Sequence, residues 1–349
     1  MSIEYPLILP TTPGLRSAEF HARQISGMTA SPFTGQQQVY EWPGEWWEAD
    51  CSLPPMARAA AEEWLATELA LRGGAGTFLL GDRGGKTPRG SGAGYPSVDG
   101  SSQLGKTLAT LGWNPSASGV LKKGDYLQIV KNYLPNPRAF ENASWGKIQC
   151  TVTGVNTVTA PNGAVEAEEI TATAGYTVFH VYQNATSLVP QYKGQTYSFS
   201  VWAKVPSGTL TNFKIRIYDG AGEGSTTVTL TTAWQRIVVS YTLPLSASQI
   251  TAYISRTGTT DGIIIHLWGG ALYAASIDAR LHKNLTEASS DANAKASLDL
   301  WPRLREAPPD FSALILTDAK GTFRLREAPG WTLDEMLHYG ISFKAMEAF

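Results

Sequence analysis

Apolar and polar positions alternate most clearly just before residue 54, where Trp47, Ala49, Cys51 and Leu53 are separated by charged and hydroxyl residues. This is the period of a half-buried β-strand. Two prolines close the strand, and residues 56–72 then carry apolar side chains at helical spacing before a pair of glycines. A short apolar run, "GTFLLGD", follows at once. The pattern predicts a strand, a helix and a second strand.

Residues 84–107 differ in composition, because Gly, Ser, Pro and Thr replace most of the groups that could form a core. We predict a long exposed loop or arm here, since uninterrupted loops of this length are usually functional or mobile. The stretch "GDRGGKT" at its start is one residue too short for a phosphate-binding loop. A solvated hairpin is the favoured interpretation of that stretch.

The strand predicted at Leu121–Val130 ends abruptly, and nothing directly after it continues the pattern. From residue 279 the chain returns to short strands separated by Ser, Asp, Asn and Pro turns, which continue the interrupted strand better. Residues 132–275 hold 15 charged residues among 144, against 43 among the other 205. We therefore predict a small β-barrel interrupted by an inserted module, an arrangement that exposed loop tips tolerate.

Within 132–275, short apolar alternations recur at even spacing with turn residues between them and no helical period. Examples are "YTVFHVYQN", "TYSFSVWAKV", "FKIRIYDG" and "ITAYISRTG". This pattern predicts a β-sandwich of jelly-roll type and places the whole chain in the mainly β class.

Three phrases of the insert carry a resemblance: "NYLPNPRAFENASW", "YSFSVWAKVPSGT" and "IIIHLWGGALY". They resemble the carbohydrate-binding modules carried by many phage tail proteins. Modules of that type usually close with an acidic residue that helps to hold a structural calcium, whereas this sequence has Tyr273 there. We therefore predict no metal.

The flanking sequence is similar to the distal tail proteins of long-tailed phages. The similarity rests on "WPGEWWEADCSLPPMARAAAEEWLATELALRGGAGTFLLGD", "GVLKKGDYLQI", "RLHK", "LWPRLREAP" and "KGTFRLREAPGW". It implies a tail-tube-like β-sandwich with one flanking helix, built into a ring of six copies at the virion tail tip after assembly in the host cytoplasm. The partners implied are other copies of the chain, the tail tube protein, the tail hub and the fibre proteins, together with a host surface glycan for the insert.

Together these observations predict three parts. Residues 1–105, completed by 320–349, form the tube-like ring domain. Residues 106–131 plus 276–319 form the small β-barrel, and residues 132–275 form the inserted jelly roll.

Composition narrows the function further. Of 349 residues, 43% are hydrophobic and 17% are charged, which is typical of a globular chain. The formal charge of −2 provides no field to recruit nucleic acid or an anionic membrane, and no apolar run reaches the ~20 residues of a membrane span. Cys51 and Cys150 fall in different predicted modules, which argues against a disulfide framework.

Catalytic motifs are not evident. The five histidines form no HxxxH or HExxH pair that would indicate zinc. Glu166, Glu168 and Glu169 could supply the two carboxylates of a glycosidase, but a solvated strand edge is the favoured interpretation. We predict a structural protein that is not an enzyme and has no cofactor; the alternative is a carbohydrate-active enzyme with a non-catalytic sugar-binding module.

The candidate sugar site comes from strand alternation. Trp202 and Lys204 fall on the polar face of their strand, as do Arg216 and Tyr218 on the next and Tyr253 on a third. Aromatic rings beside hydrogen-bonding groups suit a sugar, whose C–H faces stack while its hydroxyls are bridged. We predict that these five residues form one carbohydrate-binding cluster.

Overall fold

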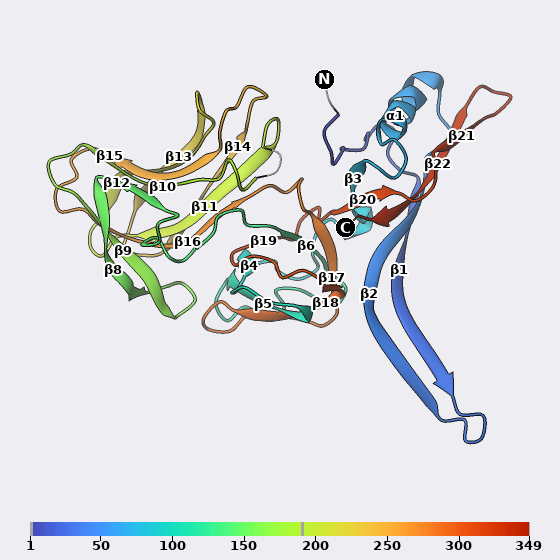
Figure 1. Ribbon diagram of the computed structural model, residues 1–349, viewed down its shortest axis with the longest axis horizontal. Coiled ribbons are helices and arrows are strands. Elements are labelled where there is room, and N and C mark those ends of the chain that lie inside the picture. The colour runs from blue at the N-terminus through green and yellow to red at the C-terminus, as the bar shows by residue number, and fades with distance from the viewer. Residues whose placement is uncertain (1–2, 190–191, 349) are drawn as a thin grey trace.

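The computed structural model describes residues 3–189 and 192–348, which are mainly β-strand with one α-helix. Figure 1 shows three parts in a row: a β-sandwich, a small barrel, and a sheet that extends into a long hairpin. The predicted mainly β class, with a flanking helix, a small barrel and a sandwich, is confirmed. The described residues contain no helix with the length and apolar character of a membrane span.

Both ends of the chain contribute to the terminal sheet. Its strands lie in the order β1 (Ser17–Ala30), β2 (Gln37–Ser52), β22 (Tyr339–Glu347), β20 (Gly321–Leu325) and β3 (Thr77–Leu80), with β21 (Gly330–Leu333) paired to β22. Helix α1 (Arg58–Ala70) packs on this sheet, where Trp64 lies 6.3 Å from Phe343 between ring centroids. The strand, helix and strand predicted between residues 47 and 83 are therefore confirmed.

The β1–β2 hairpin is longer than the alternation at 47–53 indicates. It projects away from the rest of the molecule (Figure 1). Large apolar side chains stay exposed along its outer half, among them Met28, Phe33 and Trp42. Exposed apolar side chains on an extended hairpin are typical of a surface that contacts another protein.

The barrel closes through strands from both sides of the insert. Its order is β17 (Arg280–Asn284), β18 (Ala296–Leu304), β5 (Gly105–Trp113), β4 (Gly94–Val98), β19 (Ala313–Ile315) and β6 (Tyr126–Val130). The strand predicted at 121–130 corresponds to β6.

The prediction of an exposed loop or arm at 84–107 is wrong for residues 94–98 and 105–107, which belong to β4 and β5 in the barrel wall, whereas residues 86–93 and 99–104 lie outside helices and strands. Glycine makes this possible: a Cβ on Gly94 would lie 2.5 Å from the carbonyl oxygen of Gly112, and both glycines have positive φ. The strands approach too closely for larger residues. As a result β4 belongs to the barrel, although our division assigned residues up to 105 to the ring domain; the other boundaries stay predictions.

The insert leaves the barrel at the end of β6 and returns at the start of β17. These two strands are antiparallel neighbours, with Ile129 opposite Arg280. Between them, one sheet of the sandwich contains β13 (Glu223–Leu230), β12 (Leu210–Tyr218), β15 (Thr251–Thr257), β10 (Val178–Asn184) and β7 (Gly146–Ile148). The other contains β14 (Gln235–Thr242), β11 (Thr196–Lys204), β16 (Ile264–Tyr273), β9 (Val165–Ala172) and β8 (Cys150–Thr159).

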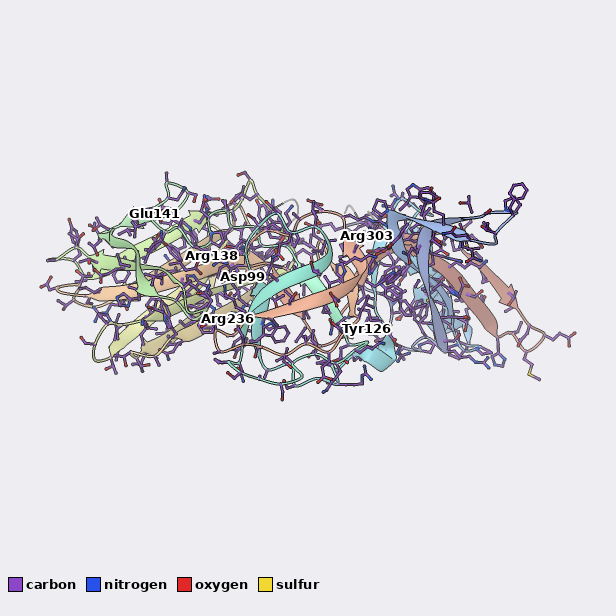
Figure 2. The ribbon with its side chains drawn as sticks, turned by 90° about the horizontal axis from the view of Figure 1, so that it is seen from below. Asp99, Tyr126, Arg138, Glu141, Arg236 and Arg303 are labelled. Carbon is purple, nitrogen blue, oxygen red and sulfur yellow. The ribbon has the colours of Figure 1, made fainter. Side chains whose placement is uncertain are left out.

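A half-buried joint fixes the sandwich to the barrel. Arg138 of the insert donates to Asp310 at 2.7 and 2.9 Å, to Asp99 at 2.9 Å and to Glu166. Figure 2 labels Arg138 and Asp99 at this junction. Beside them Trp268 makes an edge contact with Phe311, at 4.8 Å between ring centroids. The joint therefore combines ion pairs with aromatic packing.

The β6–β17 pairing makes the insert replaceable. We expect a variant with residues 132–275 replaced by a short Gly/Ser linker to keep a folded barrel, because the two strand ends already lie side by side. Loop closure changes the free energy by only roughly 0.6 kcal/mol per doubling of length. Cooperative thermal unfolding of the shortened chain, and of the excised module, is the measurement. Loss of folding in both pieces would show that the boundaries are misplaced.

Helix α1 contains an unusual buried acid. Glu68 is buried, and neither carboxylate oxygen has a hydrogen-bond partner among the described residues. Burial raises its pKa from 4.5 to about 7, because desolvation disfavours the charged form. The folded state thus holds this proton more tightly than the unfolded chain. Protonated Glu68 therefore adds to the free energy of unfolding at low pH, and this contribution is lost as the pH rises from about 4.5 through 7.

Replacing Glu68 with Met should remove this decline and stabilise the protein at pH 8 by about 1–3 kcal/mol, since no buried carboxylate then ionises. Denaturant unfolding at pH 5 and pH 8 measures the difference. The control is Glu63→Met, an exposed position on the same helix, which should keep the parent's pH dependence. A Glu68→Met protein whose stability still falls between the two pH values would contradict this assignment.

Candidate functional site

The structure divides the five predicted sugar-site residues between two sheets. Trp202 and Lys204 lie on β11, whereas Arg216 and Tyr218 lie on β12 and Tyr253 lies on β15. The two sheets pack face to face around the core, so their outer faces point in opposite directions. The prediction of a single cluster is therefore wrong: alternation says which residues leave the core but not which sheet their strand joins.

Trp202 belongs to the side of the sandwich that faces the barrel. Its ring lies 6.4 Å from that of Trp268, which is fully buried. Arg236, the cross-strand neighbour of Trp202 on β14, places its guanidinium over the ring of Tyr95 in the barrel, 4.8 Å from the ring centre. Lys204 lies over Trp234 at 4.9 Å. Trp202 and Lys204 are thus engaged at or beside the joint, which leaves the opposite sheet as the open face.

The outer face of the other sheet carries a row of residues in register across all five strands. Tyr182 of β10 is opposite both Gly146 of β7 and Tyr253 of β15, and Arg216 of β12 is opposite both Tyr253 and Ser225 of β13. Residues opposite one another on neighbouring strands share a face. The structure thus brings Tyr253 and Arg216 together with Tyr182, a residue that the sequence reasoning missed.

The rings of this row are close to one another. The rings of Tyr182 and Tyr253 are 5.2 Å apart between centroids and 21° from parallel, and Tyr218 makes an edge contact with Tyr253 at 6.3 Å. A Cβ on Gly146 would lie 2.4 Å from the Tyr182 ring, so only glycine lets that ring lie over β7. We call Tyr182, Tyr218, Tyr253 and Arg216 the tyrosine face.

The signal for Tyr182 was present in the sequence. In "YTVFHVYQN" it alternates with the buried Phe179 and Val181, and it shares its side of the strand with His180. The same alternation that identified Tyr218 and Tyr253 would have identified it, had it been applied to this strand.

Polar groups flank the row on both sides. His180, Ser255 and Lys214 lie in register on one side. Thr251, Tyr218 and Glu223 lie in register on the other. The face therefore combines half-buried rings with hydroxyl, imidazole and charged groups.

Charges on this face are partly compensated. Glu223 pairs with both Lys214 and Arg216, and these hydrogen bonds hold its pKa below 4.5 although burial works to raise it. Burial, and then the charge of Arg216, lower the pKa of His180, so its imidazole is neutral at pH 7. Among the described residues, neither His180 Nδ1 nor Arg216 Nε has a hydrogen-bond partner. Both atoms are enclosed by the protein, so contacts to hydroxyl or anionic groups of a ligand would fall to His180 Nε2 and Arg216 Nη2.

The three glutamates considered for catalysis are engaged elsewhere. Glu166 accepts hydrogen bonds from Arg138 and Trp268, and Glu169 lies 3.5 Å from His266. Glu168 is fully buried, and burial together with the neighbouring Glu141 raises its pKa to about 8. They occupy the side of the sandwich nearest the barrel rather than the tyrosine face.

The turn at 140–142 directs three backbone carbonyl groups toward one point, and the ammonium group of Lys147 lies there. Lys147 Nζ donates to the backbone oxygens of Phe140, Glu141 and Asn142 at 2.7, 3.1 and 3.2 Å. Calcium would need several free oxygen ligands, and no group of three His, Cys, Asp or Glu side chains in the described residues could hold a metal. Tyr273, at the position where related modules place an acid, is opposite Ser198. The turn at 140–142 therefore offers no free set of backbone oxygens to a calcium ion.

Comparisons with known proteins give several partial likenesses. No curated protein sequence matches the chain at a significant level. TmCBM61, solved in complex with β-1,4-galactotriose, is 18% identical over 41% of this chain and 99% of its own, with a TM-score of 0.32. The CBM22-1 xylan-binding domain from Paenibacillus barcinonensis Xyn10C is 14% identical over 44% of this chain and 96% of its own, with a TM-score of 0.31.

A domain of bacteriophage CBA120 tailspike protein 4 is 16% identical over 40% of this chain and 21% of its own, with a TM-score of 0.31. The family match is confined to the insert: residues 133–261 match the model described as "Carbohydrate binding domain". The chain therefore contains a carbohydrate-binding domain of the CBM4/9 type.

Proposed function

We propose that the chain binds glycans through the tyrosine face. The observation that carries this proposal is the row of Tyr182, Tyr253 and Arg216 in register across the sheet. Tyrosine rings offer rigid apolar surface to a sugar, while His180 and Glu223 supply hydrogen-bonding groups on either side. The family match of residues 133–261 supports the same function.

For the whole chain we propose a structural role at the tip of a phage tail, in a ring of six copies that joins the tail tube protein to hub and fibre proteins. The similarity of the flanking sequence to distal tail proteins is the main support. The terminal sheet adds a second observation in support. Strand β1 lies at the edge of the sheet, and the β1–β2 hairpin exposes Tyr40 and Trp42 on one face. Closing a ring would cover such an edge.

Ring assembly would also strengthen glycan binding. A single open face buries little of a ligand and has to offset the ligand's lost translational freedom. Several copies on one particle raise the local concentration, so avidity can exceed single-site affinity by ~10² to 10⁴. We therefore propose that the insert helps a particle to adsorb to host surface glycans.

The first test is on the tyrosine face. Tyr182→Ala and Tyr253→Ala should each weaken glycan binding at least tenfold, about 1.4 kcal/mol, because each removes a ring that contacts the sugar. Tyr176→Ala, an exposed tyrosine of the same module outside the row, is the control and should bind like the parent. Glycan-array binding of the full chain, with melting temperatures of each variant, is the measurement. Parent-like binding by both row variants would place the site elsewhere.

The second test is on the hairpin. Changing Tyr40 and Trp42 together to Ser should reduce ring formation in light scattering and native mass spectrometry, because the exposed apolar contact is lost. Leu245→Ser, an exposed apolar position in the sandwich, should leave assembly unchanged. A parent chain that stays monomeric at high concentration, and is missing from the tip in images of tails, would contradict the ring. Turnover of a polysaccharide by the purified chain would instead favour the alternative, a carbohydrate-active enzyme.

A further inference from the structure

The tyrosine face carries more positive than negative charge. Lys214 and Arg216 extend from the same side of β12, and both pair with one carboxylate, Glu223 of β13. The next acid along the chain, Asp219, is 2% exposed and accepts hydrogen bonds from the backbone N–H groups of Ala221 and Gly222 and from a tyrosine hydroxyl. One carboxylate therefore serves two cations, and one positive charge stays uncompensated.

Arg216 is placed where a bound sugar would meet it. Its guanidinium lies 4.4 Å from the centre of the Tyr253 ring and shares the row with Tyr182. Its Nη1 donates to Glu223 and its Nε is enclosed by the protein, whereas Nη2 makes no hydrogen bond to the described residues and the side chain is 23% exposed. A guanidinium has five N–H donors in a planar fork that matches an anionic group with two oxygens. Arg216 thus keeps donors for an anion held beside the rings.

We propose that the preferred ligands of the tyrosine face are acidic glycans, whose carboxylate or sulfate groups are bound by Arg216 and Lys214 while the sugar contacts the half-buried rings of Tyr182 and Tyr253. This inference rests on the proposed glycan-binding function of the same face. His180 adds a neutral hydrogen-bonding group on the Lys214 side of the row, since its lowered pKa keeps it uncharged at pH 7. Glu223 weakens the attraction for an anion, because its carboxylate already pairs with both Lys214 and Arg216.

The experiment uses the full chain on a glycan array that holds matched neutral, uronate-bearing and sulfated glycans. Strongest binding to acidic members supports the proposal, and the comparison of uronates with sulfates identifies the anionic group. Strongest binding to neutral members overturns it while leaving the proposed glycan-binding function in place. Binding to none overturns the proposed function itself.

Variants of the charged residues sharpen the test. Arg216→Met and Lys214→Met should weaken binding of the best acidic ligand at least tenfold, and by a larger factor than they weaken binding of neutral glycans. Glu223→Gln should strengthen acidic binding about three- to tenfold, because it frees both cations; a gain of affinity cannot result from misfolding. Equal loss of neutral and acidic binding in the Met variants, together with no gain in Glu223→Gln, would overturn the role of charge.

Discussion

The antiparallel pairing of β6 with β17 is the constraint on which the rest of the molecule depends. The backbone bonds between Tyr126–Val130 and Arg280–Asn284 close one side of the barrel, and they also bring together the two ends of the insert. Two strands that are far apart in sequence pair correctly only if the rest of the fold holds them side by side in one register. The barrel supplies that register because its own strands come from both sides of the insertion. A sandwich of more than 140 residues is thus carried between two neighbouring strand ends.

The joint at Arg138 decides which surface of the sandwich is free. Asp310 and Asp99 come from the barrel side and Glu166 from the insert, so one guanidinium ties the two parts together. Half-buried ion pairs contribute little net stability, because partial desolvation offsets their attraction, but an unpaired member would be costly. The cluster therefore selects one orientation. With Trp268 packed on Phe311, the sheet of β11 and β16 faces the barrel, and the sheet of β10, β12 and β15 stays open.

The two proposed roles, glycan binding and ring assembly, use separate surfaces of the molecule. The open sheet face and the β1–β2 hairpin lie at opposite ends of the molecule in Figure 1, so contacts along the hairpin would leave the tyrosine face unobstructed. The terminal sheet offers unpaired backbone along β1 and exposed apolar side chains. The sandwich offers rings beside polar groups. The two surfaces suit different partners, a protein edge in one case and a sugar in the other.

Local pattern determined much of this architecture. Three patterns depend on neighbouring residues alone: the alternation at 47–53, the helical spacing after it, and the even recurrence of strands in the insert. Each predicted the correct type of element. The strand at 94–98 escaped the pattern because its glycine and proline are typical of loops, although Val98 is buried in the barrel core and the strand pairs with β5. Alternation likewise identified Tyr218, Tyr253 and Trp202 as lying off the core. Only the tertiary structure could place Trp202 on the opposite sheet, and put Tyr182 beside Tyr253, because strand order is set by pairing between residues far apart in the chain.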